Sequence, residues 1–116
     1  MNSLETQWTP VFDGLEGFNQ YVDMGSVHRY PNWVEMWDLI DYNSVQVFRG
    51  KNVLSVNSRW AFDVEKKKAR LIESVYYGGL LGGGDVCFHG DEIYLWSPIE
   101  PGSVVEAMWE IACGKR

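Results

Sequence analysis

Few residues in this chain have types and spacing that could do chemistry. Cys87 and His89 stand two apart, so in an extended strand both side chains would point to one face, where the imidazole could activate the thiol. A working site would also need an orienting group, and besides His89 only His28 could supply an imidazole. Two such residues in a strand are more often packing residues, so we predict no catalytic residue.

A glycine-rich segment, residues 78–84, is the next candidate, because glycine-rich loops hold phosphate groups in nucleotide-binding proteins. Such a loop continues into a lysine and a serine or threonine, whereas Gly84 is followed by Asp85 and Val86. A dinucleotide-binding fold would need a helix directly after the glycines, and the residues that follow are typical of strands and turns. The segment predicts a flexible loop or bulge between strands, and no nucleotide cofactor.

The carboxylates and cysteines do not form a metal-binding or hydrolytic pattern. The scattered aspartates are Asp13, Asp23, Asp38, Asp41, Asp85 and Asp91. The sequence brings no two of them together as a glycosidase pair requires, and they lack the regular alternation of a calcium loop. Two widely spaced cysteines do not match a zinc site. We therefore expect no metal ion and no cofactor, and interpret the aspartates as solvated and turn residues.

The two cysteines, Cys87 and Cys113, allow one disulfide. Closing a loop of about 26 residues would stabilise the fold by roughly 3–4 kcal/mol if the bond forms without strain. The alternative is two small buried side chains with free thiols, and the redox state of the compartment decides between them. The residues alone leave both interpretations open.

Length and charge limit the class of protein. A chain of 116 residues fits one domain, residues 1–116, and can bury one substantial core. Its formal charge of −6 disfavours nucleic acid or an anionic membrane as the main partner, since both attract positive charge. No apolar run is long enough for a membrane span, and the first residues lack the pattern of a signal peptide. These features fit a cytosolic protein or a mature form with an added Met.

A helix is predicted at the end of the chain, from Ser103 to Cys113. The Ser103 hydroxyl can accept a hydrogen bond from an early helical N–H, and Glu106 can reach back to the N–H of Ser103. The apolar residues then recur at steps of three and four: they are Val104, Val105, Met108, Ile111 and Ala112. This spacing forms one apolar stripe, so the helix must pack against another element.

Most of the remaining chain predicts strands, consistent with an aromatic content of 15%. The expected strands are residues 8–12, 18–22, 27–30, 33–42, 53–64, 68–77, 85–89 and 92–96. Residues 65–67 are the predicted turn of the clearest hairpin, and residues 43–52 fit either a strand pair or a long loop. Both faces of the segment 33–42 are partly apolar, which favours a central strand or one covered on both sides.

These elements predict a single α+β domain. One antiparallel, strongly twisted sheet of about five or six strands runs as a meander, and the C-terminal helix packs on one of its faces. A homodimer formed across the sheet would also explain the two apolar faces of residues 33–42.

The order of several residues resembles the surface-adhesin protein E family of Gram-negative bacteria. The resemblance covers nearly the whole chain and rests on Trp8, Tyr21-Val-Asp23, Ser26-Val27, Arg29, Val34-Glu-Met-Trp37-Asp-Leu39-Ile-Asp41, Asp63, Arg70, Tyr76, Trp96-Ser-Pro-Ile99-Glu-Pro101-Gly-Ser103, Glu106 and Cys113. It implies a small domain exported to the periplasm or cell surface, with an antiparallel sheet and a C-terminal helix. It also implies a binding function, because the family's namesake is a dimeric adhesin for host matrix and plasma proteins.

One departure from the family pattern concerns the cysteines. Family members usually carry a cysteine directly after the aspartate at position 63, paired with the C-terminal cysteine, whereas this chain has Val64. The resemblance therefore suggests that Cys87 has taken over as the partner of Cys113.

The resemblance also directs attention to candidate protein-binding residues. A basic hairpin tip carries Lys66, Lys67, Lys68 and Arg70, and the candidate aromatic anchors are Trp33, Trp37, Trp60 and Tyr76. The competing interpretations are a solvated tip and aromatic core residues under the helix.

We predict non-catalytic binding of a protein partner, either host matrix or envelope protein. Two other classes are considered. Small size, acidity and tryptophan content also fit a cytosolic inhibitory or immunity-type module. A small enzyme would need buried aspartate or histidine groups with shifted pKa values in a pocket.

Overall fold

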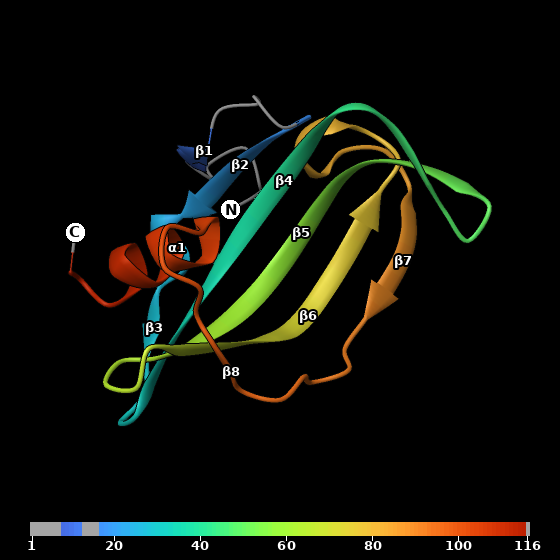
Figure 1. Ribbon diagram of the computed structural model, residues 1–116. Helices are drawn as coiled ribbons and strands as arrows, with labels where there is room; N and C mark the ends of the chain where they lie inside the picture. Colours follow the sequence, from blue (N-terminus) through green and yellow to red (C-terminus); the bar gives the residue numbers. More distant parts are fainter. Residues whose placement is uncertain (1–7, 13–16, 116) are drawn as a thin grey trace.

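The computed structural model of the chain describes residues 8–12 and 17–115 (Figure 1). Within these ranges eight strands form one antiparallel sheet, and one α-helix follows them. The strands are β1 (Trp8–Phe12), β2 (Phe18–Asp23), β3 (His28–Arg29), β4 (Trp33–Phe48), β5 (Lys51–Asp63), β6 (Lys68–Tyr77), β7 (Val86–Gly90) and β8 (Ser97–Pro98), and the helix is α1 (Val104–Ala112). The predicted fold class is confirmed, with more strands than the expected five or six.

The sheet is a meander in which neighbours in sequence are mostly neighbours in space. Its main path is β1-β2-β4-β5-β6-β7, while β3 pairs with β4 and β8 pairs with β6. The central pair, β4 and β5, places Val34 opposite Phe62 and Ile40 opposite Val56, so apolar side chains of both strands share one face. Strand β4 is therefore central, as the two apolar faces of residues 33–42 predict.

Helix α1 begins where the capping residues predict. The hydroxyl of Ser103 accepts a hydrogen bond from the N–H of Glu106 at 3.1 Å. The carboxylate of Glu106 reaches back one residue further than expected, because it accepts from the N–H of Gly102 at 2.8 Å and not from that of Ser103. The first contact satisfies an N–H that a helix leaves unpaired at its start, and the second holds the turn that precedes the helix.

The core lies between α1 and one face of the sheet. Its fully buried members are Val22, Val34, Met36, Phe62, Met108 and Ala112, each no more than 1% exposed. The indole of Trp109 also donates to the backbone oxygen of Asp63 at 2.8 Å, which ties the helix to the end of β5.

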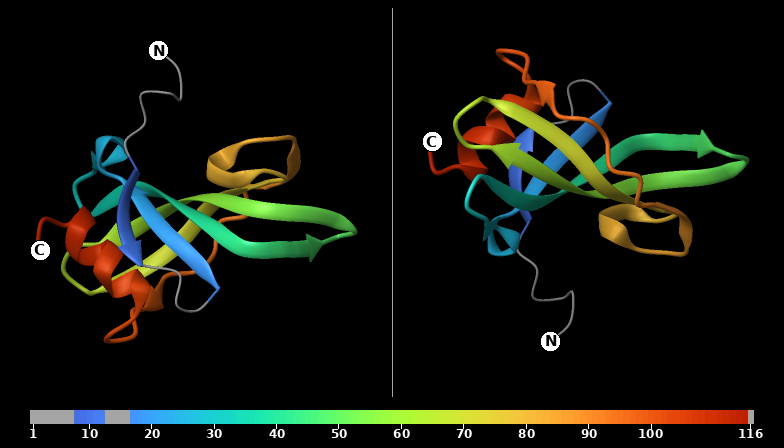
Figure 2. Two further views of the ribbon diagram at one scale, coloured as in Figure 1. Left: turned by 90° about the horizontal axis from the view of Figure 1, so that it is seen from above. Right: turned by 90° about the horizontal axis from the view of Figure 1, so that it is seen from below.

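The helix covers only part of that face. Nine helical residues span about 14 Å, whereas the sixteen residues of β4 follow a curved path of about 53 Å within a molecule that extends 39 Å along its longest axis. Figure 2 shows the β4–β5 hairpin extending far from α1 in both views. One half of the sheet therefore packs under the helix, and the other half has no helix over it.

Two segments differ from the sequence-based expectation. Residues 43–52, which fitted either a strand pair or a loop, continue β4 to Phe48 and enter β5 at Lys51. The two connecting residues, Arg49 and Gly50, have φ values of 52° and 78°, as in a two-residue hairpin turn of type I′. The predicted strand 92–96 is wrong, because the chain leaves β7 at Gly90 and runs irregularly until β8.

We call residues 91–96 the strap. Its backbone is attached to β6 by a hydrogen bond from the N–H of Tyr94 to the oxygen of Leu71 at 3.0 Å. In Figure 1 the strap runs between the ends of β7 and β8, along the outer side of β6. Within the described residues, no helix is long and apolar enough to cross a membrane.

Candidate functional site

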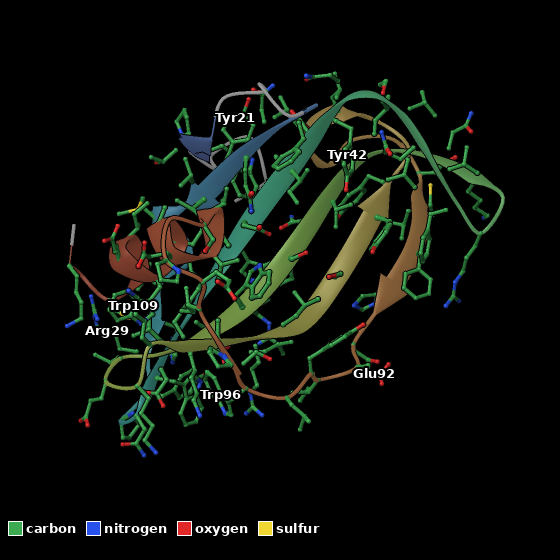
Figure 3. All side chains as sticks on the ribbon, viewed as in Figure 1. Tyr21, Arg29, Tyr42, Glu92, Trp96 and Trp109 are labelled. Carbon is green, nitrogen blue, oxygen red and sulfur yellow. The ribbon has the colours of Figure 1, made fainter. Side chains whose placement is uncertain are left out.

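An open cleft of roughly 500 Å³ lies at the half of the sheet that the helix leaves uncovered. It is bounded by the tip of the β4–β5 hairpin, by β6 and β7, and by the strap, on which Glu92 is labelled in Figure 3. The residues that line it are Phe48, Arg49, Leu71, Glu73, Ser74, Tyr76, Phe88, His89, Gly90, Asp91, Glu92 and Tyr94. The cleft brings together strands β4, β6 and β7, which are separated in sequence.

Three rings form the apolar wall of this cleft, and we call Phe48, Tyr76 and Phe88 the aromatic cluster. The centroid of Phe48 lies 4.6 Å from that of Tyr76 and 5.3 Å from that of Phe88, and the Tyr76 and Phe88 rings meet edge to face at 5.6 Å. The guanidinium of Arg49 lies over the cluster, 4.5 Å from the Phe88 centroid and 5.3 Å from the Phe48 centroid. These distances are typical of cation–π contacts.

The strap presents an apolar surface beside the cleft. Ile93 and Tyr94 are each 57% exposed, and Leu95 is 86% exposed. Three consecutive large side chains at this exposure are unusual on a soluble domain, where exposed apolar residues are normally scattered singly. The strap therefore has the composition of a contact surface.

Charged groups border the cleft on the β6 and β7 side. The carboxylate of Glu73 accepts hydrogen bonds from His89 Nε2 at 2.8 Å and from Arg59 Nε at 3.2 Å. Although burial opposes it, these two partners lower the pKa of Glu73. Asp91 and Glu92 follow on the exposed strap. Glu73 is thus held as a carboxylate inside the cleft, with two further carboxylates at its rim.

Cys87 and His89 do not form a catalytic pair. His89 is bonded to Glu73, whereas Cys87 Sγ lies 3.5 Å from the backbone oxygen of Asn52 and lines a separate hollow near Gly78. The two side chains thus have different partners, and no thiol–imidazole contact is formed.

Asp38 corrects a prediction from the sequence. The aspartates were expected to be solvated or in turns, and Asp38 is neither. It is 1% exposed on the helix side of β4, where Gln20 Nε2 donates to its Oδ2 at 2.6 Å. Burial raises the pKa of Asp38 to about 7, against the opposing hydrogen bond from Gln20. Its Oδ1 and the Nε1 of nearby Trp60 have no hydrogen-bond partner in the described part of the chain.

Asp38 is not among the residues that line the cleft. Tyr42, which is labelled on β4 in Figure 3, is close enough to both Asp38 and Tyr76 to interact with their charges. Burial, then the charges of Tyr76 and Asp38, raise the pKa of Tyr42, so the polar part of the core lies next to the aromatic cluster. A carboxyl group enclosed in this way influences folding stability, but it does not meet a substrate in solution.

The structure does not bring Cys87 and Cys113 together, and the expected disulfide is absent. Cys87 contacts Asn52 at the start of β5, whereas Cys113 lies near Asp63 at the end of β5. Eleven strand residues separate these points, which corresponds to roughly 36 Å, and a disulfide joins Cα atoms within about 7 Å. Local spacing could not reveal this, because the separation depends on the length of β5.

The basic tip is largely occupied by contacts within the domain. Lys67 forms an ion pair with Glu106 and lies over the Trp109 ring, so it joins the hairpin to the helix. The guanidinium of Arg70 stacks on Trp96 at 4.6 Å. Lys66 is exposed, and Lys68 is half-buried at the start of β6. Two of the four residues, Lys67 and Arg70, thus have partners within the chain.

The four aromatic candidates separate into three places. Trp33 stacks on Tyr30 at 4.6 Å, and Trp37 lies under the guanidinium of Arg59, both on the face of β4 opposite the helix. Trp60 packs against the core, as the competing interpretation predicts. Of the four, Tyr76 is the one that lines the cleft.

The glycine-rich segment is an ordered loop. The hydroxyl of Ser55 donates to the oxygen of Gly79 at 2.6 Å and accepts from the N–H of Gly82 at 3.0 Å. The carboxylate of Asp41 accepts from the N–H of Leu81 at 2.8 Å. Two buried polar side chains of β4 and β5 thus anchor the loop, and the N–H groups of Leu81 and Gly82 are used within the chain.

Sequence reasoning missed most of the cleft. Phe48, Arg49, Phe88 and Tyr94 are not among the predicted site residues, because residues 43–52 fit two interpretations and residues 92–96 fit a strand. The available signal was Arg49-Gly50 between two runs of strand-forming residues, which is a hairpin pattern.

In the described part of the chain, no group of three His, Cys, Asp or Glu residues could hold a metal ion.

Comparisons with known proteins agree on one family. Residues 8–114 match the family described as surface-adhesin protein E. Crystal form II of Haemophilus influenzae protein E is similar, with a TM-score of 0.67 and 14% identity over 94% of this chain and 95% of that chain. Protein E from non-typeable Haemophilus influenzae gives a TM-score of 0.65 and 13% identity over 97% of this chain and 78% of that chain. A comparison with curated protein sequences gives no match.

Proposed function

This chain belongs to the surface-adhesin protein E family of adhesin-like surface proteins, and on that premise we propose that it is a non-catalytic domain that binds a protein partner through the strap and the neighbouring cleft. The partner class is host matrix or envelope protein, in keeping with the family. The domain would act after export, either in the periplasm or at the cell surface.

The exposure of Ile93, Tyr94 and Leu95 is the observation that carries the proposal. Covering a large apolar side chain that is now in water stabilises a complex by about 1.5–3 kcal/mol. Three such residues beside a cleft supply an apolar centre, while Asp91 and Glu92 supply part of a polar rim. This arrangement meets the needs of a modest protein interface.

The proposal is tested by binding of the purified chain to immobilised basement-membrane extract, measured by surface plasmon resonance. We expect saturable binding by the wild type and at least tenfold weaker binding by Leu95→Ser, because the most exposed apolar side chain on the strap is removed. The control is Leu80→Ser, an exposed leucine in the glycine-rich loop, which should bind like the wild type.

Equal losses in both variants would indicate general stickiness of exposed leucines and contradict the proposal. Binding unchanged in Leu95→Ser would place the contact elsewhere on the domain. The homodimer remains a proposal as well, and light scattering at micromolar concentration would test it by giving the mass of one chain or two.

A further inference from the structure

We propose that the cleft binds a cationic side chain, an arginine or lysine that the protein partner presents, and that the chain's own Arg49 occupies this position in the unbound state. This inference rests on the proposed binding function and names the chemistry that the same site would recognise. It is argued from the rings, the backbone of Arg49 and the charges of the cleft.

The aromatic cluster already holds a cation. The Arg49 guanidinium lies 4.5 Å from the Phe88 centroid and 5.3 Å from the Phe48 centroid, so it contacts two rings that themselves touch Tyr76. Ring faces attract cations through their quadrupoles, and clustered aromatic rings are a recurrent receptor for such groups. The cluster therefore has the chemistry of a cation site.

The attraction comes from the rings and not from an acidic partner of Arg49. Among the residues that the structure describes, Arg49 forms no hydrogen bond and no ion pair, and its recorded contacts are the two ring faces. All five N–H donors of its guanidinium can therefore turn to water, so the side chain can leave without breaking a bond to the protein.

The backbone at Arg49 gives an independent reason to assign it a role. With φ at +52°, it stands at the first position of a type I′ turn, where asparagine, aspartate or glycine is normally preferred. A residue kept in an unfavourable conformation points to a functional constraint. Here this backbone conformation places the Arg49 guanidinium over the Phe48 and Phe88 rings.

The charge at the rim of the cleft also favours a cation. Asp91 and Glu92 are exposed there, and the whole chain carries a formal charge of −6. The carboxylate of Glu73, deeper in the cleft, is already paired with Arg59 and His89. An incoming ammonium or guanidinium would replace Arg49 on the rings and approach the rim carboxylates, while Arg49 turns into solvent at the hairpin tip. An anionic group would meet this negative potential.

The test compares the wild type with Arg49→Asn, since asparagine suits the positive φ and lacks the competing cation. The probe is Nα-acetyl-arginine amide, titrated into isotopically labelled protein and followed by amide chemical shifts. We expect shifts at Phe88 and Tyr94, and binding about threefold tighter in Arg49→Asn. The neutral isostere Nα-acetyl-citrulline amide should cause no shifts at these positions.

Lys66→Asn is the matched control, because it removes the same charge from the tip of the other hairpin and should leave the affinity unchanged. Phe88→Leu in the Arg49→Asn background should abolish binding of the probe, with circular dichroism confirming the fold. Equal affinity in wild type and Arg49→Asn, or shifts caused by citrulline or by Nα-acetyl-glutamate amide, would overturn the inference. The probe does not require the natural partner, so this result is independent of binding to matrix extract.

Discussion

Replacing Asp38 by asparagine should change how folding stability depends on pH. Asp38 is buried beneath the helix, and burial raises its pKa from 3.8 to about 7. This rise corresponds to about 4 kcal/mol of free energy. Between pH 4 and pH 7 the unfolded chain has released this proton and the folded chain still holds it. The wild type therefore loses stability as the pH rises through this range.

The asparagine variant has no proton to lose, so this contribution to the slope disappears. The amide oxygen can still accept from Gln20 Nε2, but the NH2 group then takes the place of Oδ1, which has no partner, and an unpaired buried donor costs about 1–3 kcal/mol. We expect Asp38→Asn to be less stable than the wild type at pH 4 by about 1–3 kcal/mol. At pH 8 the order reverses, and the variant should be more stable by about 1–3 kcal/mol.

The measurement is urea unfolding followed by tryptophan fluorescence at whole pH values from 4 to 8. The difference between the two unfolding free energies isolates Asp38, because all other titrating groups are common to both proteins. Asp85→Asn is the control, since it removes an exposed carboxylate and should follow the wild-type curve. Parallel curves for the wild type and Asp38→Asn would refute the assignment of a raised pKa to Asp38.

Three further predictions concern the helix and the cysteine that follows it. Ser103→Ala removes the acceptor for the N–H of Glu106 and should lower the unfolding free energy by about 1 kcal/mol, measured by urea unfolding. Trp109→Phe removes the hydrogen bond to the Asp63 oxygen and should cost about 1 kcal/mol in the same assay, and an unchanged midpoint would contradict its contribution. Burial raises the pKa of the Cys113 thiol, so its alkylation should be slow at pH 7 and accelerate above pH 9. Mass spectrometry without reductant measures this reaction. Absence of alkylation in both the native and the unfolded chain would indicate a disulfide.

The sequence predicted the elements whose signals are local. The start of α1 follows from Ser103 and the glutamate three residues later, and the turn between β5 and β6 follows from three charged residues between two apolar runs. The order of the strands was also accessible, because a meander joins neighbours in sequence. These features depend on residues a few positions apart, where the spacing itself carries the information.

The cleft could not be predicted in the same way. Phe48, Tyr76 and Phe88 meet only because the registers of β4, β5, β6 and β7 bring them to one place, and each of the three pairings between these strands contains a register shift. The strap was misassigned because its apolar residues fit a strand, although β6 offers it a single backbone hydrogen bond. One face of β4 carries the alternate residues Val34, Met36, Asp38 and Ile40, and Asp38 is its acidic member. The sequence could not show that Asp38 is buried, because its burial depends on where the helix packs.

The two edges of the sheet affect how the chain behaves when many copies are concentrated together. Strand β1 contains Pro10, which has no N–H to offer, and its pairing with β2 shifts between Pro10 and Phe12. At the opposite edge, β6 is divided between the short strands β7 and β8. Among the described residues, neither edge presents a long row of free backbone donors and acceptors. Chains crowded together are therefore hindered from adding edge to edge into fibrils, and the apolar residues of the strap can stay exposed without seeding aggregation through the backbone.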